Sequence, residues 1–195
     1  PPSAATVRKM MNFIAGADIP EHYVPFMEEE LGIKGEDTKH PHWETEKLKS
    51  ARKDMRVVVI GAGMSGILSA IRLKQAGIAF EVIEKNADVG GTWFENTYPG
   101  CRVDNPNHMY SFSFEPNHDF PYHYSTQDVL LSYFQRTADK YDLRENIRFE
   151  THVTEARFDE ETSKWHVTIK DKHGKEGTLI ANALISAVGQ LNQPK

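Results

Sequence analysis

The sequence predicts an α/β fold, in which a parallel sheet contains an inserted antiparallel meander and follows a helical N-terminal extension. Three observations predict it. The apolar run Val57–Ile60 leads directly into a glycine-rich turn, Gly61–Gly66. A second, largely apolar run, Phe80–Ile83, ends at Glu84. Several short strand patterns then precede a last apolar run, Ala183–Val188. This order of elements is typical of a Rossmann-like site for a nucleotide diphosphate: a strand, a glycine-rich turn, a helix, a second strand and an acid at its end.

Each glycine of the turn has a separate predicted role. Gly61 allows a sharp turn out of the strand, Gly63 leaves no Cβ between the backbone and a pyrophosphate, and Gly66 lets the helix pack closely on the strand. Met64 and Ser65 lie with Gly66 at the start of the following helix. Unpaired N–H groups and the helix dipole attract phosphate there. This segment therefore predicts the diphosphate end of a dinucleotide site.

The acid at the end of the second strand indicates which dinucleotide is bound. The intervening helix is predicted from apolar residues at helical spacing after Ile67, and it ends at Gly77. Glu84 is expected to accept hydrogen bonds from the adenosine ribose hydroxyls and to repel a 2′-phosphate. This first site should therefore take FAD or NAD rather than NADP. A second glycine pair, Gly90–Gly91, followed by an aromatic segment, favours a flavin over a bare nicotinamide.

Two domains are expected. Residues 1–54 form a helical extension and residues 55–195 form the first segment of an FAD-binding domain. Thr6–Ala15 and Glu21–Leu31 have the pattern of short amphipathic helices. The extension contains no catalytic chemistry that the sequence identifies. It is expected either to pack on another part of the protein or to pair with a second copy, as a homodimer.

Composition excludes several classes of function. A net charge of −5 over 195 residues argues against nucleic-acid binding. The Lys and Arg residues between Lys47 and Arg56 are expected to lie on a solvated helix face. The longest apolar stretch, Val57–Ile71, is broken by glycine and serine, so no membrane span is expected.

Cys101 is the only cysteine, which predicts a reducing, cytoplasmic compartment and no internal disulfide. His40 and His42 are expected to be surface residues, and no metal is predicted.

The second half of the chain completes the α/β pattern. Ser125–Asp128 has helix-start chemistry, and apolar residues from Leu130 to Tyr141 repeat at helical spacing. Ile147–Phe149 is expected to be a short strand. Three antiparallel strands are then expected at 153–158, 165–169 and 177–180. The final apolar run ends at Gly189 and is expected to return to the parallel sheet.

The segment from Gly90 to Asp104 indicates a family. Its sequence, GGTWFENTYPGCRVD, resembles the GG-[TV]-W-x-x-N-x-Y-P-G-x-x-x-D segment of Baeyer–Villiger monooxygenases, the class B flavoprotein monooxygenases. The likeness continues through His108–Phe114 and Ala187–Leu191, and it covers residues 55–195. The N-terminal extension, with its Gly16–Pro20 segment, resembles that of the 4-hydroxyacetophenone monooxygenase branch.

The resemblance implies cofactor contacts for a set of residues beyond the first turn. Gly91 and Thr92 would place donors near the FAD phosphates and ribityl chain. Trp93 and Phe94 would wall the isoalloxazine, or else serve as ordinary core aromatics. Arg102 would lie near the nicotinamide cofactor, with a surface role as the alternative. The full implied set behind the turn is Gly91, Thr92, Trp93, Phe94, Glu95, Arg102, Asp104, the flavin-contacting Tyr110, and Val153, whose backbone would meet the adenine.

Asp104 is the one residue for which the resemblance implies a catalytic role. The matching aspartate lies beside the flavin and orients an arginine from a later domain. That arginine stabilises negative charge on the oxygenated flavin and on the intermediate formed with the ketone. Without the motif, an aspartate before Asn105–Pro106 would more often be a turn cap. The neighbouring Cys101 is not expected to act as a nucleophile.

The implied reaction requires more than these residues. In the family, NADPH reduces FAD, O₂ adds to give a C4a-peroxyflavin, and this attacks a ketone to give an ester or lactone. The chain ends at Lys195 before a second glycine-rich fingerprint and before the catalytic arginine. It is therefore expected to be incomplete relative to the full family fold and inactive by itself. Two alternatives stay open: a heteroatom-oxidising flavin monooxygenase, and a non-catalytic FAD-binding or assembly module.

Overall fold

The computed structural model describes residues 1–32, 35, 37–41 and 46–190, and the chain forms two compact units. The first unit comprises Pro1–His40 and His108–His118, and the second comprises Pro41–Asn107 and Asp119–Lys195. A domain boundary between residues 54 and 55 stays a prediction. His42, named above as a surface residue, lies outside the described residues.

The first unit is helical at its N-terminal end, as the sequence predicts. Helix α1 (Ala4–Ala15) begins after Ser3, whose Oγ accepts a hydrogen bond from the Thr6 N–H, and ends at Gly16 in the left-handed region. The predicted second helix is divided into a 3₁₀ turn, η1 (Glu21–Tyr23), and α2 (Val24–Glu30). Proline at the second position of α2 explains the division, because it supplies no N–H to continue the preceding turn.

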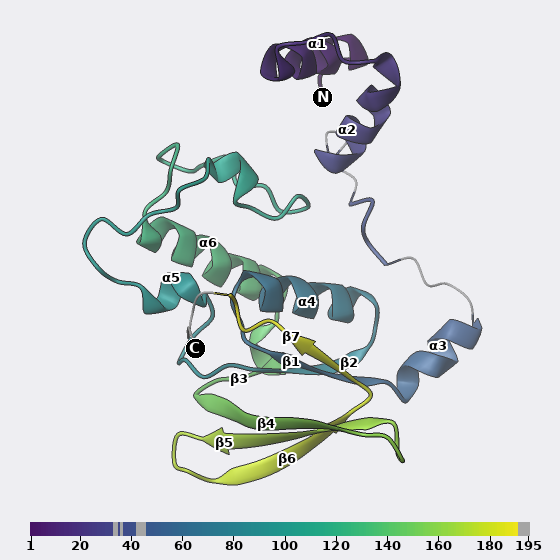
Figure 1. The fold of residues 1–195 in the computed structure, drawn as a ribbon, viewed down its shortest axis with the longest axis vertical. Helices are drawn as coiled ribbons and strands as arrows, with labels where there is room; N and C mark the ends of the chain where they lie inside the picture. The colour runs from purple at the N-terminus through teal and green to yellow at the C-terminus, as the bar shows by residue number, and fades with distance from the viewer. Residues whose placement is uncertain (33–34, 36, 42–45, 191–195) are drawn as a thin grey trace. The chain divides into compact units, whose positions relative to one another are not determined.

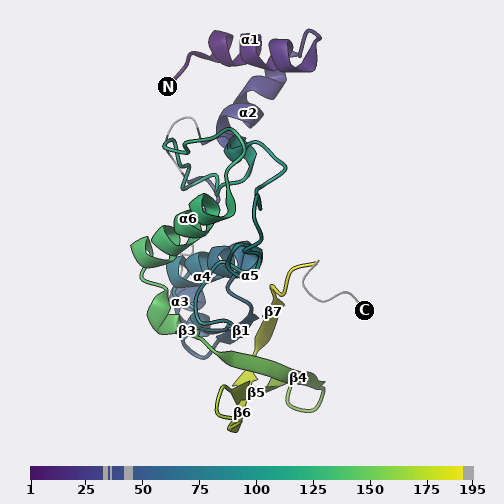
Figure 2. The same cartoon turned by 90° about the vertical axis from the view of Figure 1, so that its left-hand side faces the viewer.

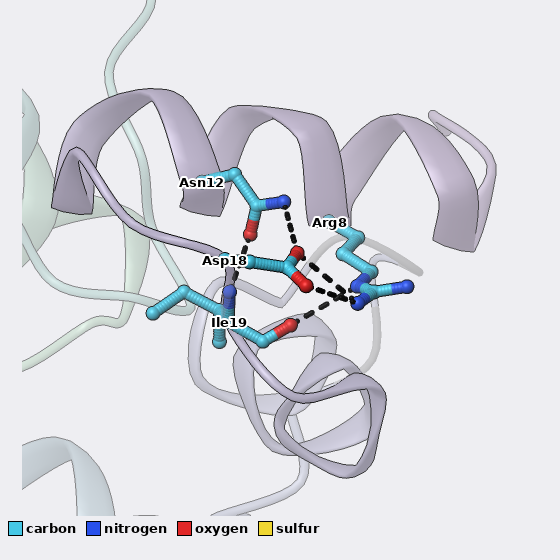
Figure 3. A network of polar contacts seen from close by, with 4 residues as sticks. All are labelled: Arg8, Asn12, Asp18 and Ile19. Carbon is cyan, nitrogen blue, oxygen red and sulfur yellow. Dashed lines mark hydrogen bonds and ion pairs between the residues drawn. The ribbon is translucent and has the colours of Figure 1, made fainter.

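A polar network folds the end of α1 onto the segment that follows it (Figure 3). The Arg8 guanidinium donates to both oxygens of Asp18 at 3.2 and 3.3 Å and to the Ile19 carbonyl at 3.0 Å. Asn12 donates to Asp18 at 2.8 Å and accepts from the Ile19 N–H at 2.8 Å. The Gly16–Pro20 segment therefore has a defined conformation against α1.

The second unit is built on a parallel sheet of four strands in the order β3-β2-β1-β7. The strands are β1 (Arg56–Ile60), β2 (Ala79–Ile83), β3 (Ile147–Arg148) and β7 (Ala183–Ser186). Helix α4 (Met64–Gln75) connects β1 to β2, and α6 (Gln127–Lys140) precedes β3; α3 (Glu46–Lys53) precedes β1. In register, Ile60 pairs with Ile83 and with Ser186, so all three strands end together.

The antiparallel meander is present where the sequence predicts it. Its strands are β4 (Thr151–Asp159), β5 (Lys164–Asp171) and β6 (Glu176–Ala181), in the order β4-β5-β6. Helices α4 and α6 lie on one side of the parallel sheet and the meander lies on the other (Figures 1 and 2). Val58 and Ile83 of the sheet pack with Val167, Ile169 and Ala181 of the meander in one buried cluster. This core fixes the orientation of the sheet whose carboxyl end forms the candidate site.

Among the helices that the structure describes, none has the length and apolar character needed to cross a membrane. Within the same residues, no cluster of three or more histidine, cysteine, aspartate and glutamate side chains could hold a metal ion.

Candidate dinucleotide-binding site

The glycine turn and Glu84 lie together because β1 and β2 are neighbouring parallel strands that end at the same edge of the sheet. The Gly61 N–H donates to the Ile83 carbonyl at 2.8 Å, so the chain leaves β1 still bonded to β2. Gly61 has φ 98°, and a Cβ there would lie 2.7 Å from the Ala187 carbonyl oxygen behind β7. Only glycine allows both this backbone angle and this contact.

Helix α4 begins in contact with the turn that precedes it. A Cβ on Gly66 would lie 1.9 Å from the Gly61 carbonyl oxygen, so no side chain can be placed there. The first hydrogen bond along this helix runs from the Ile67 N–H to the Gly63 carbonyl at 2.9 Å. The N–H groups of residues 64–66 precede that bond at the positive end of the helix dipole. This geometry suits an anionic phosphate.

The second glycine pair lies directly against the first turn. The Gly90 N–H donates to the Ala62 carbonyl at 3.0 Å, and a Cβ on Gly91 would lie 2.9 Å from the Gly63 Cα. Both Gly90 and Gly91 have positive φ, at 127° and 54°. Two backbones without side chains therefore meet, which leaves peptide groups rather than side chains at the surface where a ligand would approach.

Glu84 is bonded to the turn by its side chain. Its carboxylate is buried, with 3% of the residue exposed; Oε2 accepts from the Ala62 N–H at 2.6 Å and Oε1 from the Asn86 N–H at 2.8 Å. Each carboxylate oxygen retains a second lone pair that could accept a ribose hydroxyl. The sequence predicted the position of this acid but not its bond to Ala62, and the ribose contact stays a prediction.

Asp88 holds the loop in front of the glycine pair, and sequence reasoning missed it. Its carboxylate accepts from Arg144 Nη1 at 2.7 Å, from Gln135 Nε2 at 2.8 Å and from the Val89 N–H at 2.8 Å. Burial alone would raise the pKa of the Asp88 carboxyl, but these three hydrogen bonds and the Arg144 charge together lower it below its ordinary value. Asp139 also accepts from Arg144 and holds that guanidinium in place. No spacing rule in the sequence indicates these partners, because they come from α6 and the turn after it.

The aromatic segment forms a single helical turn, α5 (Thr92–Glu95), directly after the glycine pair. Trp93 is buried, Phe94 is half-buried and Thr92 is exposed. The Trp93 carbonyl accepts from the Gln127 side-chain amide, which connects this turn to the start of α6. Glu95, predicted to lie at the cofactor, forms an ion pair with Lys85 at 2.8 Å.

Arg102 and Asp104 lie on the exposed face of an irregular strand, while Cys101 and Val103 on the other face are buried. This strand pairs antiparallel with the segment before α6: the Val103 N–H donates to the Ser125 carbonyl and the Gln127 N–H to the Cys101 carbonyl, both at 3.0 Å. The alternation therefore places the predicted catalytic aspartate and the predicted nicotinamide-side arginine on one face.

Val153 lies on β4, and Tyr110 lies in the segment that belongs to the first compact unit. The Thr151 N–H donates to the Glu84 carbonyl at 2.9 Å, so β4 begins at the carboxyl end of β2, two residues before Val153. Val153 itself pairs with Ile169 and packs against the meander core. Tyr110 is half-buried and belongs to the first compact unit, whereas the other predicted site residues belong to the second.

The comparisons with known proteins agree with this geometry. A family model described as NAD(P)-binding Rossmann-like domain matches residues 59–124. A Baeyer–Villiger monooxygenase from Streptomyces coelicolor is 40% identical over 149 residues, covering 75% of this chain and 28% of the relative. A second, from Pseudomonas aeruginosa, is 39% identical over 151 residues, covering 77% of this chain and 28% of the relative. The crystal structure of OTEMO in complex with FAD and NADP has a TM-score of 0.64 at 36% identity, covering 73% of this chain and 27% of that chain. This chain is similar to Baeyer–Villiger monooxygenases over about three quarters of its length.

The chain spans about a quarter of the length of these Baeyer–Villiger relatives. The fold alone does not distinguish Baeyer–Villiger monooxygenases from enzymes that oxidise a heteroatom. An S-allyl-L-cysteine S-oxygenase from Allium sativum has the same fold, with a TM-score of 0.65 at 22% identity. The likeness to Baeyer–Villiger monooxygenases rests instead on sequence identity with these relatives.

Proposed function

We propose that this chain is the FAD-binding portion of an NADPH- and O₂-dependent Baeyer–Villiger monooxygenase that converts ketones to esters or lactones. One observation supports this most directly: the backbones of Gly63 and Gly91 are in contact with no side chain between them. Beside this contact, the Ala62 N–H donates to the buried carboxylate of Glu84. A dinucleotide requires a close backbone approach for its diphosphate and an acceptor for its ribose hydroxyls. The likeness to Baeyer–Villiger monooxygenases supports the flavin and the class of reaction.

The residues present fit FAD. The N–H groups of Met64, Ser65 and Gly66 would hold the diphosphate at the N-terminus of α4. Glu84 would accept from the adenosine ribose, and the Val153 backbone would meet the adenine, since β4 begins beside Glu84. When bound, FAD would accept electrons from NADPH and activate O₂ toward the ketone.

The second glycine pair and the segment behind it would serve the flavin end. Gly91 and Thr92 would donate to the phosphates and ribityl chain, and Trp93 and Phe94 would keep water from the isoalloxazine. Glu95 keeps this turn in place through its ion pair with Lys85.

Asp104, on the exposed face, would orient an arginine supplied by the remainder of the protein, and that cation would stabilise developing negative charge. Arg102, on the same face, would lie toward the nicotinamide, and Tyr110 would contact the flavin.

The experiment compares the full-length parent protein with residues 1–195. The parent should purify with a flavin absorbance spectrum and convert a ketone to an ester with NADPH and O₂. Residues 1–195 alone should form no ester, because they span about a quarter of the length of the Baeyer–Villiger relatives and contain one glycine-rich fingerprint. A parent that is colourless and does not bind added FAD would refute the proposal, and ester from residues 1–195 would refute the second expectation.

The proposal includes the 4-hydroxyacetophenone monooxygenase branch and a cytoplasmic location. The resemblance of the Gly16–Pro20 segment to the extension of that branch supports it, and 4-hydroxyacetophenone is the substrate to assay first. A single, buried cysteine supports a reducing compartment.

The proposal also includes pairing of two copies through the extension. Met10, Phe13 and Ile14 lie three and four residues apart on α1 and are 53%, 89% and 83% exposed. Such a stripe on a helix is typical of a surface that another helix covers. Phe13→Ser with Ile14→Ser should delay elution of the full-length protein in size exclusion, whereas Lys9→Ser should not. Unchanged elution of the double variant would remove the pairing.

A further inference from the structure

Asp104 lies on a bulge between two backbone anchor points. The Val103 N–H donates to the Ser125 carbonyl, and the Asn107 N–H donates to the His123 carbonyl, both at 3.0 Å. Three residues, Asp104–Pro106, lie between these anchors on one strand, whereas only Tyr124 lies between them on the other. An unequal count of this kind bends a strand and changes the direction of its side chains.

The side chain of Asn107 fixes this bulge. Its Oδ1 accepts from the Ser125 N–H at 2.9 Å, and its Nδ2 donates to Ser125 Oγ at 2.7 Å and to the Tyr122 carbonyl at 2.5 Å. We name these three hydrogen bonds the Asn107 anchor. Asn107 is 2% exposed and Ser125 is fully buried. Because both donors and the acceptor of a buried amide are used, any other arrangement of the strand leaves polar groups unpaired.

The anchor also connects two parts of the candidate site. Ser125 is bonded to Asn107 through its N–H and to Val103 through its carbonyl, so one residue holds both ends of the bulge. Two residues further along, Gln127 binds the Trp93 carbonyl of α5 through its side chain and the Cys101 carbonyl through its N–H. The strand with Asp104 and the aromatic turn are thus held by the same short segment before α6.

We propose that Asn107 is a positioning residue, which sets the direction of the Asp104 carboxylate through Ser125. This inference rests on the proposed function of Asp104. It assigns to a buried, uncharged side chain the task of keeping the acid where it can orient a cation. In the absence of the anchor the bulge relaxes, and the acid no longer holds one position relative to α5.

The test uses the full-length holoenzyme with Asn107→Ala, Ser125→Ala and the control Asn105→Ala, which changes an exposed residue of the same bulge. Two quantities are measured: hydrogen exchange of the Ser125 amide, and the amount of ester formed per NADPH consumed. Asn107→Ala should increase the exchange rate and lower the ester yield per NADPH, each about tenfold, as expected for one or two hydrogen bonds lost from a buried group. Ser125→Ala keeps the N–H and loses one bond, so it should have a smaller effect on both; it serves as the test if Asn107→Ala does not fold. The control should change neither.

A double-mutant cycle with Asp104→Ala separates positioning from general destabilisation. If Asn107 acts through Asp104, then Asn107→Ala should lower the yield per NADPH no further in the Asp104→Ala background. Additive losses, or unchanged Ser125 exchange in Asn107→Ala and Ser125→Ala, would overturn the positioning role. A normal ester yield per NADPH in Asp104→Ala would also overturn the positioning role, because Asp104 would then have no effect for Asn107 to act through. A wild-type parent that forms no ester would instead refute the proposed function.

Discussion

The turn that would hold the diphosphate and the strand that contains Asp104 are held in different ways. Around Gly61, Gly66 and Gly91, backbone lies against backbone, at distances that exclude any Cβ. Between residues 101 and 107 the backbone is irregular, and buried side chains such as Asn107 hold it. Backbone contact makes the turn rigid through the absence of side chains, whereas the strand depends on particular hydrogen-bonding groups.

The difference has a consequence for substitutions. In the glycine-rich turn, almost any added side-chain atom should destabilise the fold. In the segments that side-chain hydrogen bonds hold, the loss of stability depends on which hydrogen bond is lost. Substitutions of Glu84 and Asp88 should have effects between these two cases. Each of these side chains accepts a hydrogen bond from a backbone N–H next to the glycines of the site.

Gly66→Ala should have the largest effect. The new Cβ would lie 1.9 Å from the Gly61 carbonyl oxygen, so α4 or β1 must move. We expect a loss of roughly 3 to 5 kcal/mol in the free energy of unfolding, with loss of bound flavin. Urea denaturation and the flavin absorbance of the full-length protein measure both. Gly177→Ala is the matched control, since its Cβ would meet only Ile169 at an ordinary 3.7 Å. Equal stability of the two variants would contradict the backbone-contact account.

Glu84→Gln should have an intermediate effect. A carboxamide offers one acceptor oxygen, so either the Ala62 N–H or the Asn86 N–H loses its buried partner. We expect about 2 kcal/mol lower stability and about tenfold weaker FAD binding. Flavin titration and denaturation of the full-length protein are the measurements, with Glu155→Gln on the exposed face of β4 as control. Unchanged FAD affinity in Glu84→Gln would remove the predicted ribose contact.

Asp88→Asn should have the smallest effect, and one that depends on pH. The pair with Arg144 is partly exposed, so solvent screening limits the loss at neutral pH to about 1 kcal/mol. Because the pKa of Asp88 is lowered in the folded chain, its contribution is fully present above the ordinary carboxyl pKa and is lost as pH falls through the folded pKa. The stability difference between wild type and variant should therefore be constant near neutrality and disappear in acid.

The control for this measurement is Asp142→Asn, at a well-exposed side chain 4.0 Å from Lys74. Asparagine tolerates the left-handed backbone of that position, so a change below about 0.5 kcal/mol is expected. If the Asp88→Asn difference persisted unchanged in acid, the stabilisation would not come from the carboxylate charge.

Much of the fold follows from local patterns in the sequence. The strands around Val58, the helix after Gly66 and the meander lie within a few residues of their predicted bounds. Local chemistry decides these elements: apolar periodicity, glycine at a sharp turn, and helix-start residues before α6. The division of the second predicted helix at Pro25 was missed, although proline indicates it.

Local patterns along the chain specify the α/β architecture and the glycine-rich turn, because glycine spacing and apolar periodicity act over short distances in sequence. They also locate Glu84 and the segment from Gly90 to Asp104. The hydrogen bonds that hold these residues become visible only in the folded chain: Ala62 bonds to Glu84, Arg144 to Asp88, and Asn107 to Ser125. These partners lie from 18 to 56 residues apart in sequence, and no local propensity specifies a hydrogen bond between groups that only folding brings together.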